Sequence, residues 1–592
     1  MKTSQMNITG ILGAASCDPL QLERVRRSID KLVEYGTGPS CLISGNEYIV
    51  YVNGCKTVLG GMENDESQTF IVGTHYSSGN KHYEVGHFLV FQPKGRQGFS
   101  FRTDPVGLIN LYRYSDRGVT IFGTSSMQVA ALVPHLEHDS IGMQEFLVAG
   151  YLFSSRTYYK GIDVVPGGID WIVEPGEDIK GVEKAWYGHP NLKVYDERGS
   201  INELIQATRK AASNIAADGH ACCDLTGGYD SRGVASMFLA AGLPFSTVVN
   251  GSPALPDVRI AQAISTKFGF DHYHNDTSSF LPPQDYRDIA RTIVLTDGEI
   301  DVPEYYNTEL IHRITAGKGW LTVNGSGGEL FRGYWWEGEW PDEGTKRQVE
   351  VDYLVKRIML PHLDFSFFRI AESDIKNYVR QVVKNVTDAV GHDEPSGRRI
   401  DMLYLKVRMG RWFARFYSST QKILPCHSPF LTKPVLDIAL GIQPVEKKRV
   451  RFYRKWLFAN HRQLAIIPLE NLAPAIPCTW TSAWHFRHYP AYILRKVLDR
   501  LQRKFLPNQA GRLALSQLED AFLSIGSRES GSCCFMPPVK DLLSNGAAEK
   551  FERLLGGEDQ HIQISQFSRV FTLDLTLREV GKLRSMLDAE CR

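Results

Sequence analysis

The sequence contains little cysteine, and its cysteines are not spaced for metal binding. Ten cysteines in 592 residues are too few for a disulfide framework. No two of them stand in a C-x-x-C pattern, so the sequence gives no support to a zinc site or a thioredoxin-like redox site. A reducing compartment is therefore expected, and we predict a cytoplasmic protein.

The sequence also lacks a large net charge and a long apolar run. Its 67 lysines and arginines nearly balance 66 aspartates and glutamates, which leaves a formal net charge of +1. That balance excludes nucleic-acid binding through overall charge. No run of about 18 apolar residues occurs, and the first residues are too polar for a signal peptide. We therefore expect neither a membrane span nor a nucleic-acid partner.

What remains is an ordinary globular composition, with 43% hydrophobic and 22% charged residues. Residues 1–190 contain short apolar or alternating runs separated by Gly, Asp and Asn, as in antiparallel strands joined by tight turns. These runs cover 47–53, 87–93, 109–115 and 119–125. From residue 200 onward, helix-like and strand-like runs alternate, which favours βαβ units on a parallel sheet. We therefore predict a β-rich domain over 1–190 and an α/β domain with a helical C-terminal part over 200–592.

A glycine-rich loop follows the strand-like run 221–225 and opens a helix-like segment, a position where α/β sheets bind ligands. Its glycines let a phosphate approach the backbone closely, and its hydroxyl side chains add hydrogen-bond donors. The candidate phosphate-binding residues are Thr226, Gly227, Gly228 and Ser231. Asp230 would repel phosphate unless a divalent cation lay between them, so its presence suggests Mg²⁺. The alternative is an ordinary Gly-Gly turn before a capped helix.

A second glycine-rich loop follows another strand-like run, 320–324. Its sequence over 325–334, GSGGELFRGY, carries a single acid, Glu329. Since parallel strands end at the same edge of a sheet, Asp230 and Glu329 could share a metal ion there. The alternative is a glycine-rich connection in which Glu329 caps a helix. Two such loops in one α/β domain favour a binding site.

Both loops resemble motifs of the asparagine synthetase family. Residues 225–232, LTGGYDSR, are similar to the family's S-G-G-x-D-S motif. Residues 325–334 are similar to its G-x-G-[SG]-D-E-[LV]-F-G-G-Y loop, with one acid missing. Aligning the glycines places Glu329 on the family's metal-binding aspartate, whereas aligning ELF-x-GY places Gly328 there. We favour the first alignment, because it preserves a metal ligand.

The resemblance implies an ATP pyrophosphatase (PP-loop) fold that uses ATP and Mg²⁺. Asp230 and Glu329 are the implied metal ligands, and Glu329 is also counted as catalytic. Lys455 lies in a segment, 449–458, that resembles the family's K-x-x-L-R helix. It is the implied catalytic lysine, which would stabilise charge on the α-phosphate, and the alternative is a solvated lysine in a basic run. The implied contacts to ATP or pyrophosphate are Leu225, Thr226, Gly227, Gly228, Asp230, Ser231, Val249 in the strand that would flank adenine, Gly325 and Gly327.

The N-terminal part resembles the glutaminase domain of the same family, over 101–114, 121–132 and 146–168. This implies an N-terminal-nucleophile fold, an αββα sandwich whose nucleophile is a cysteine with a free α-amine. Thr9 aligns with that cysteine and is preceded by other residues, and Cys17 lies outside the motif. We therefore expect this domain to lack glutaminase activity.

Members of the family without that nucleophile include β-lactam synthetases and lasso-peptide macrolactam cyclases. By this resemblance the chain would adenylate a substrate carboxylate with release of pyrophosphate. An amine within the substrate would then attack, forming a lactam and expelling AMP. The implied partners are a carboxylate-bearing small molecule or peptide and other enzymes of a biosynthetic pathway.

Three alternatives stay open at this point. One is ammonia-dependent amidation of a small acid or sugar acid. Another is a PP-loop sulfur- or tRNA-modifying activity, which the lack of C-x-x-C disfavours. The third is a non-catalytic, nucleotide-binding scaffold, favoured by the missing acid in the second loop.

No motif identifies a general base. The acid of the family's V-E-x-R motif is missing, since the corresponding residues before Pro429-Phe430-Leu431 read Pro425-Cys426-His427. The segment 297–307 offers candidate bases or, equally, a solvated loop. The candidates are Asp301, Glu304, Tyr305 and Tyr306. A basic amphipathic segment over 487–512 could dock an acidic peptide, a carrier protein or a membrane surface, or form a solvated helix face.

Overall fold

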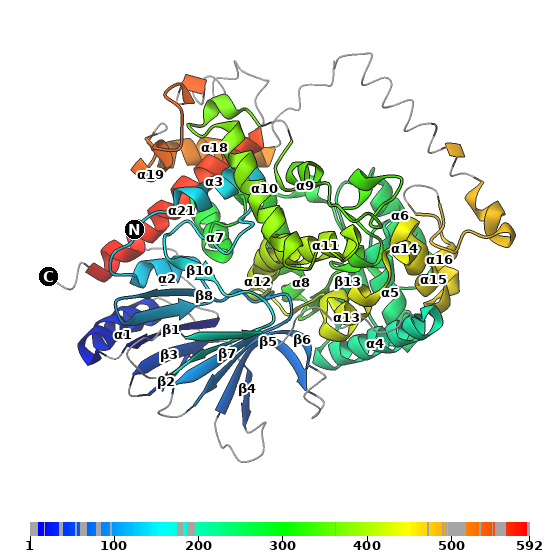
Figure 1. Ribbon diagram of the computed structural model, residues 1–592, viewed down its shortest axis with the longest axis horizontal. Helices are drawn as coiled ribbons and strands as arrows, with labels where there is room; N and C mark the ends of the chain where they lie inside the picture. Colours follow the sequence, from blue (N-terminus) through cyan, green and yellow to red (C-terminus); the bar gives the residue numbers. More distant parts are fainter. Residues whose placement is uncertain are drawn as a thin grey trace.

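The fold is mixed α/β, with two antiparallel sheets formed by the first part of the chain and a parallel sheet and many helices formed by the rest (Figure 1). This confirms the predicted combination of a β-rich and an α/β region. The computed structural model describes residues 10–16, 18–34, 40–45, 47–53, 56–59, 68–77, 84–94, 98–174, 181–185, 196–361, 363–469, 473–487, 490–491, 494, 517–531, 534–547, 549–550 and 564–588. The predicted boundary near 190–200 falls partly outside these residues.

Each antiparallel sheet has six strands among the described residues. The first has the order β10 (Ile162–Val164), β8 (Tyr112–Asp116), β9 (Val119–Gly123), β1 (Gly10–Ser16), β3 (Tyr48–Asn53) and β2 (Ser40–Ser44). The second has the order β12 (Val182–Ala185), β11 (Ile169–Val173), β7 (Phe99–Thr103), β6 (Glu84–Pro93), β5 (Gln68–Ser77) and β4 (Lys56–Leu59). The four strand-like runs named from the sequence contribute to β3, β6, β8 and β9.

Aromatic side chains join the two antiparallel sheets face to face. Phe122 of β9 lies 4.9 Å from Phe99 of β7, measured between ring centroids. Trp171 of β11 also lies near Phe122, with 5.8 Å between ring centroids. On β1, Ile11 and Ala15 belong to this core, whereas Leu12 and Ala14 pack on the opposite face with α1 (Pro19–Glu34). This alternation is the period of two expected for a strand that is buried on both faces.

The third sheet is parallel, as predicted from the alternation of helix-like and strand-like runs. Its order is β15 (Asp271–Asn275), β14 (Ser246–Asn250), β13 (Ala221–Asp224), β16 (Leu321–Val323) and β17 (Cys426–His427). The α-helices before and between β13, β14, β15 and β16 are α4 (Glu197–Asp218), α5 (Tyr229–Ala241), α6 (Pro256–Phe268), α7 (Tyr286–Thr296) and α8 (Val302–Gly317). Helix α4 begins earlier than its periodicity indicated, because Asp196 caps it by accepting from the Gly199 amide at 2.9 Å.

The strand order reverses at β13, a position at which ligands of open α/β sheets commonly bind. From β13 the chain proceeds to β14 and β15 on one side, and then returns to β16 and β17 on the other. Ligands of open α/β sheets bind at the carboxyl ends of strands where the order reverses. Both glycine-rich loops follow strands that flank this point, β13 and β16.

The remaining α-helices pack around the three sheets and against one another. The α-helices are α2 (Ser126–Leu132), α3 (Ser140–Ala149), α9 (Val351–Ile358), α10 (Glu372–Asp388), α11 (Ser396–Leu403), α12 (Ala414–Gln421), α13 (Lys433–Gly441), α14 (Pro444–Lys447), α15 (Arg451–Asn460), α16 (Arg462–Ile466), α18 (Gln517–Glu529), α19 (Pro537–Lys540) and α21 (Ile564–Asp588). A π-helical segment, η6 (Tyr404–Phe413), joins α11 to α12.

The last described helix, α21, lies beside α2, α3 and α7 (Figure 1). Its apolar residues share one core with α1 and the outer face of the first sheet. In the described part of the chain, no helix is both long and apolar enough to cross a membrane. Most of the basic segment predicted over 487–512 lies outside the described residues.

Candidate active site

The first glycine-rich loop is held by its own hydroxyl groups. The Thr226 amide donates to Ser231 Oγ at 3.0 Å, and the two hydroxyl groups lie 2.9 Å apart. The Gly228 amide donates to Thr226 Oγ1 at 3.2 Å, and the Gly227 amide donates to Asp257 of α6 at 2.7 Å. Thr226 and Ser231 therefore shape the loop. The N-cap residue of α5 is Gly228, which has no side chain to accept from the first-turn amides. These amides are therefore candidate donors for a ligand.

Glycine brings the second loop directly against the first turn of α5. A Cβ on Gly325 would lie 2.6 Å from the carbonyl carbon of Asp230, and one on Gly328 would lie 2.5 Å from Asp230 Oδ1. Gly327 has a φ of +93°, which favours glycine for conformational reasons. The two loops thus meet at one edge of the sheet, as the sequence predicted.

Asp230 forms a bidentate ion pair with Arg332. Arg332 follows the short 3₁₀ helix η3 (Gly328–Phe331). Arg332 Nε donates to Oδ1 at 3.2 Å, and Nη2 donates to Oδ2. The Arg332 side chain is 21% exposed and the Asp230 side chain is 17% exposed. The guanidinium also lies over the rings of Tyr229 and Tyr334, 5.9 and 5.5 Å from their centroids. Arg332 is therefore fixed in orientation while part of it stays open to solvent.

Glu329 lies in η3, near Asp230. Its Oε2 accepts a hydrogen bond from the Gly327 amide at 2.9 Å. Burial and then the charge of Asp230 raise the pKa of Glu329 to about 7, against the opposing effect of Arg332. The structure brings the two predicted metal ligands to the same place. Their assignment as ligands stays a prediction.

A preformed Mg²⁺ site does not fit this arrangement. Both oxygens of Asp230 are engaged by Arg332, and one oxygen of Glu329 is engaged by the backbone. Within the described ranges, no three or more His, Cys, Asp and Glu side chains form a group that could hold a metal ion. One reason for predicting Mg²⁺ was the unneutralised charge of Asp230, and Arg332 supplies that neutralisation. The use of Mg²⁺ with ATP stays a prediction.

Lys455 lies on α15 but points toward the start of α4. Its Nζ is 2.5 Å from Glu197 and 3.8 Å from Glu446, with 27% of the side chain exposed. Helix α15 contacts the loop through the two preceding residues instead: Tyr453 donates to the Tyr229 carbonyl at 3.2 Å, and Arg454 Nε donates to Tyr229 Oη at 3.0 Å. Lys455 is therefore paired but still partly exposed, and the solvated-lysine alternative stays open. Its catalytic role stays a prediction.

Two further residues of the predicted ATP site, Leu225 and Val249, have buried side chains. The Leu225 side chain is fully buried, and its amide donates to the Val248 carbonyl at 2.8 Å. The Val249 side chain is buried within β14.

The sequence did not predict that three arginines gather beside the two glycine-rich loops. Arg332 stands where the resembled loop has glycine, which was the available signal. Arg357 of α9 lies 5.1 Å from the Tyr334 ring centroid, and its Nε is buried with no hydrogen-bond partner. Arg454 lies 5.9 Å from the Tyr229 ring centroid. These three residues, Arg332, Arg357 and Arg454, are called the arginine cluster below.

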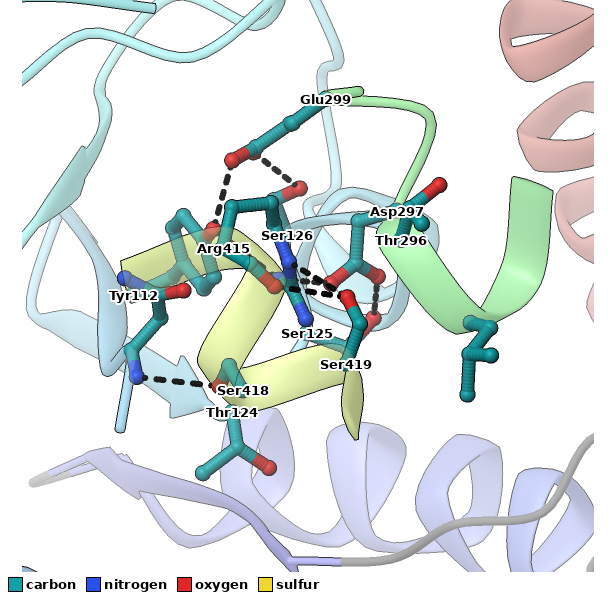
Figure 2. Close-up of polar contacts among 12 residues, drawn as sticks. Tyr112, Thr124, Ser125, Ser126, Thr296, Asp297, Glu299, Arg415, Ser418 and Ser419 are labelled. Atoms are coloured by element: carbon teal, nitrogen blue, oxygen red, sulfur yellow. Dashed lines mark hydrogen bonds and ion pairs between the residues drawn. The ribbon is translucent and has the colours of Figure 1, made fainter. Parts of the chain in front are cut away.

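The acidic segment after α7 is a buried structural turn (Figure 2). Asp297 pairs with Arg415 at 2.5 Å and accepts a hydrogen bond from Ser125. Glu299 accepts from Tyr112 at 2.7 Å and from Ser126 at 2.8 Å. The solvated-loop alternative is therefore wrong for Asp297, Glu299 and Asp301, whereas Glu304 is exposed. We call Asp297, Glu299 and Arg415, with their hydrogen-bond partners, the buried turn cluster.

Three of the four candidate bases form side-chain hydrogen bonds, and the fourth, Tyr306, is buried. Asp301 accepts from Thr572 of α21 at 2.8 Å and from Ser568, and burial raises its pKa to about 6. Glu304 accepts from Trp412 Nε1 at 3.2 Å. Tyr305 is bonded to Thr420 at 3.1 Å, and Tyr306 is buried. None of them lies in the two glycine-rich loops.

The predicted nucleophile position cannot be placed, because Thr9 and Cys17 lie outside the described residues. Nearby, Thr124 Oγ1 accepts from the Ile11 amide at 3.1 Å at the start of β1. Cys426 and His427, which replace part of the V-E-x-R motif, form the edge strand β17 and are buried.

The sequence matches no protein-family model and no curated protein. Among solved structures, the chain is similar to a glutamine phosphoribosylpyrophosphate amidotransferase from B. subtilis complexed with ADP and GMP. The identity is 10%, and the match covers 47% of this chain and 70% of that chain, with a TM-score of 0.18. A similarity at that level supports no conclusion about fold or function.

Proposed function

We propose that this chain is an ATP-dependent ligase that forms amide bonds through an acyl-adenylate. The observation that carries the proposal is the meeting of two glycine-rich loops beside β13, where the strand order of the parallel sheet reverses. The resemblance of both loops to asparagine synthetase motifs gives the reaction class. The uncapped start of α5 and the arginine cluster supply donors and positive charge for phosphates.

The proposed chemistry has two steps. A substrate carboxylate oxygen attacks the α-phosphorus of ATP, the bond from that phosphorus to the bridging oxygen breaks, and pyrophosphate leaves. An amine then attacks the acyl carbon, loses a proton, and expels AMP. The chain's part in the first step is to hold the β- and γ-phosphates on the loop amides so that the leaving group departs in line. Positioning and fixed donors can carry such a reaction with few acid–base residues.

The amine is proposed to belong to the substrate, so that the product is a lactam or macrolactam. The support is Thr9, which stands where the resembled glutaminase domain has its cysteine nucleophile. The corresponding proposal for the fold is that the two antiparallel sheets belong to an N-terminal-nucleophile-type sandwich that no longer releases ammonia. The substrate would be a small molecule or peptide that carries both carboxylate and amine.

Analysis of the nucleotide products tests this function, with a variant that blocks the loop. Gly228→Ala adds a methyl group whose nearest neighbour is Thr226 Oγ1 at 3.4 Å, so the fold should accept it while phosphate approach is obstructed. Gly317→Ala is the matched control, since nothing lies within 4 Å of a Cβ there. With ATP, Mg²⁺ and a panel of amino acids and peptides, we expect AMP and pyrophosphate from the wild type and the control.

The loop variant should lose roughly 10- to 100-fold of that activity, the cost of displacing a charged group from its hydrogen-bond donors. Formation of ADP would contradict the proposal. Tight ATP binding without turnover over the whole panel would favour the non-catalytic scaffold. AMP formation with free ammonia and a simple acid, but with no amine-bearing substrate, would favour the amidation alternative.

A further inference from the structure

We propose that Arg332 is the resident cation of this site: held by Asp230, it binds the diphosphate group of the nucleotide directly, where the sequence had indicated a metal ion. This inference rests on the proposed function, because it assigns the phosphate-binding side chain of the same site. It also reassigns Asp230 as a positioning residue.

The hydrogen bonds of Arg332 leave donors available for an anion. Asp230 accepts from Nε and Nη2 of the guanidinium. A guanidinium has five N–H groups in a planar fork, so Nη1 keeps two donors that Asp230 does not use. Tyr229 and Tyr334 contact the guanidinium as well, which limits its freedom to rotate. An arginine fixed in this way loses little conformational entropy when it binds an oxyanion.

The location of the pair is suited to a phosphate. Asp230 is in the first turn of α5, where backbone amides point outward and the helix dipole favours negative charge. Gly325 and Gly328 pack against Asp230 with no room for side chains, so the second loop carries Arg332 to the end of that helix. Helix amides and guanidinium donors therefore reach the same space from two elements.

The local charge favours an anion with more than one negative charge. The arginine cluster brings three guanidinium groups to Tyr229 and Tyr334, against the two carboxylates of Asp230 and Glu329. Among the residues that the structure describes, neither Arg357 nor Arg454 forms an ion pair with an acid, and Arg357 Nε has no hydrogen-bond partner. A diphosphate can engage several arginines at once, whereas a single carboxylate occupies one fork.

The alternative is that the ion pair only fastens the second loop to α5. Both interpretations predict some loss of stability when Arg332 is replaced. They differ in what the site binds without a metal ion, because a fastening role gives no reason for a polyphosphate to bind when divalent cations are removed.

The experiment is calorimetric titration of inorganic pyrophosphate into the full-length protein in the presence of EDTA. The wild type should bind, and Arg332→Gln should weaken binding roughly 10- to 100-fold, as expected for lost hydrogen bonds to a charged group. Arg332→Lys, which keeps the charge and loses the fork, should be intermediate. Arg209→Gln, an exposed arginine of α4, is the matched control and should bind as the wild type does.

Asp230→Asn separates positioning from metal binding. The asparagine keeps an oxygen acceptor for Arg332 and removes a negative charge near the anion, so pyrophosphate binding in EDTA should persist. Asp230→Ala, which removes the acceptor too, should weaken binding. Thermal unfolding of each variant identifies folding failures. If Arg332→Gln does not fold, then Arg332→Lys and Arg454→Gln carry the test, and both should weaken binding.

Two results would overturn the inference: pyrophosphate binding by the wild type only when Mg²⁺ is present, or equal binding by the wild type and all folded arginine variants. Its failure is distinct from failure of the proposed function. If pyrophosphate binding depends on Arg332 but no AMP forms, the inference holds and the proposed function fails. If AMP forms but pyrophosphate binding depends on Mg²⁺ and not on arginine, the proposed function holds and the inference fails.

Discussion

Two arginine–aspartate pairs, Arg332–Asp230 and Arg415–Asp297, occupy very different surroundings. At the loop edge, Arg332 is 21% and Asp230 17% exposed. In the buried turn cluster, Arg415 is 2% exposed and Asp297 is not exposed (Figure 2). The side chains of the first pair are partly exposed, whereas those of the second are buried beside the first antiparallel sheet. The difference teaches that an ion pair can bind a ligand only if burial leaves part of it accessible.

We expect the largest loss of stability from a substitution that breaks the buried pair Arg415–Asp297. Arg415→Met should lower the free energy of unfolding by about 3–5 kcal/mol, because it leaves Asp297 as a buried charge with its close partner removed. Chemical denaturation measures this. The control is Arg287→Met, since Arg287 also lies 2.5 Å from its partner, Asp285, but on the surface, where a pair contributes about 0–1 kcal/mol. Equal effects at the two positions would remove the distinction between buried and accessible pairs.

The next prediction concerns the pH dependence of stability that comes from Glu329, beside the Arg332–Asp230 pair. Burial and Asp230 raise the pKa of Glu329 to about 7, so the folded protein binds more protons than the unfolded chain between about pH 4.5 and 7. Its contribution to stability is therefore present at low pH and lost as pH rises through that window.

Glu329→Gln should flatten this part of the stability profile by up to about 1.4 kcal/mol per pH unit. Denaturation midpoints at several pH values from 5 to 8 measure the difference. Other buried acids contribute equally to both proteins, so the comparison isolates Glu329. Parallel profiles for wild type and variant would show that Glu329 ionises normally.

A smaller effect compares one glycine from each region. Gly298, inside the buried turn, has a φ of +65°, and a Cβ there would lie 1.9 Å from Thr576 Oγ1 of α21. Gly298→Ala should therefore cost about 1–3 kcal/mol through overpacking and backbone strain. Gly228→Ala at the loop edge should leave the denaturation midpoint nearly unchanged. A reversed order would mean that the loop, and not the turn, is the rigid element.

The smallest effect concerns Lys455. Its pair with Glu197 is partly exposed, so Lys455→Ala should lower stability by less than about 1 kcal/mol. The variant should also bind pyrophosphate in EDTA as the wild type does, whereas Arg454→Gln should bind more weakly. Weaker binding by the folded lysine variant would show that Lys455 reaches the phosphates, as the family resemblance implies.

The sequence was sufficient for the parallel sheet and for the meeting of the two loops, because both follow from local periodicity and from the rule that parallel strands end at one edge. It was insufficient for the pairing of Asp230 with Arg332, which are 102 residues apart. It also gave no indication that Asp301 is buried, since the residues that enclose it come from α21, about 270 residues later. Local patterns carry no information about such distant contacts.

The most direct test of the central claim is isotope exchange between pyrophosphate and ATP in the presence of candidate substrates. Reversible adenylation returns labelled pyrophosphate to ATP only when a carboxylate is present, and it needs no amine. We predict label in ATP that depends on the carboxylate, persists when the substrate amine is blocked, and falls in Gly228→Ala. Substrate-dependent ATP consumption that yields ADP, with no label in ATP, would contradict the adenylation mechanism.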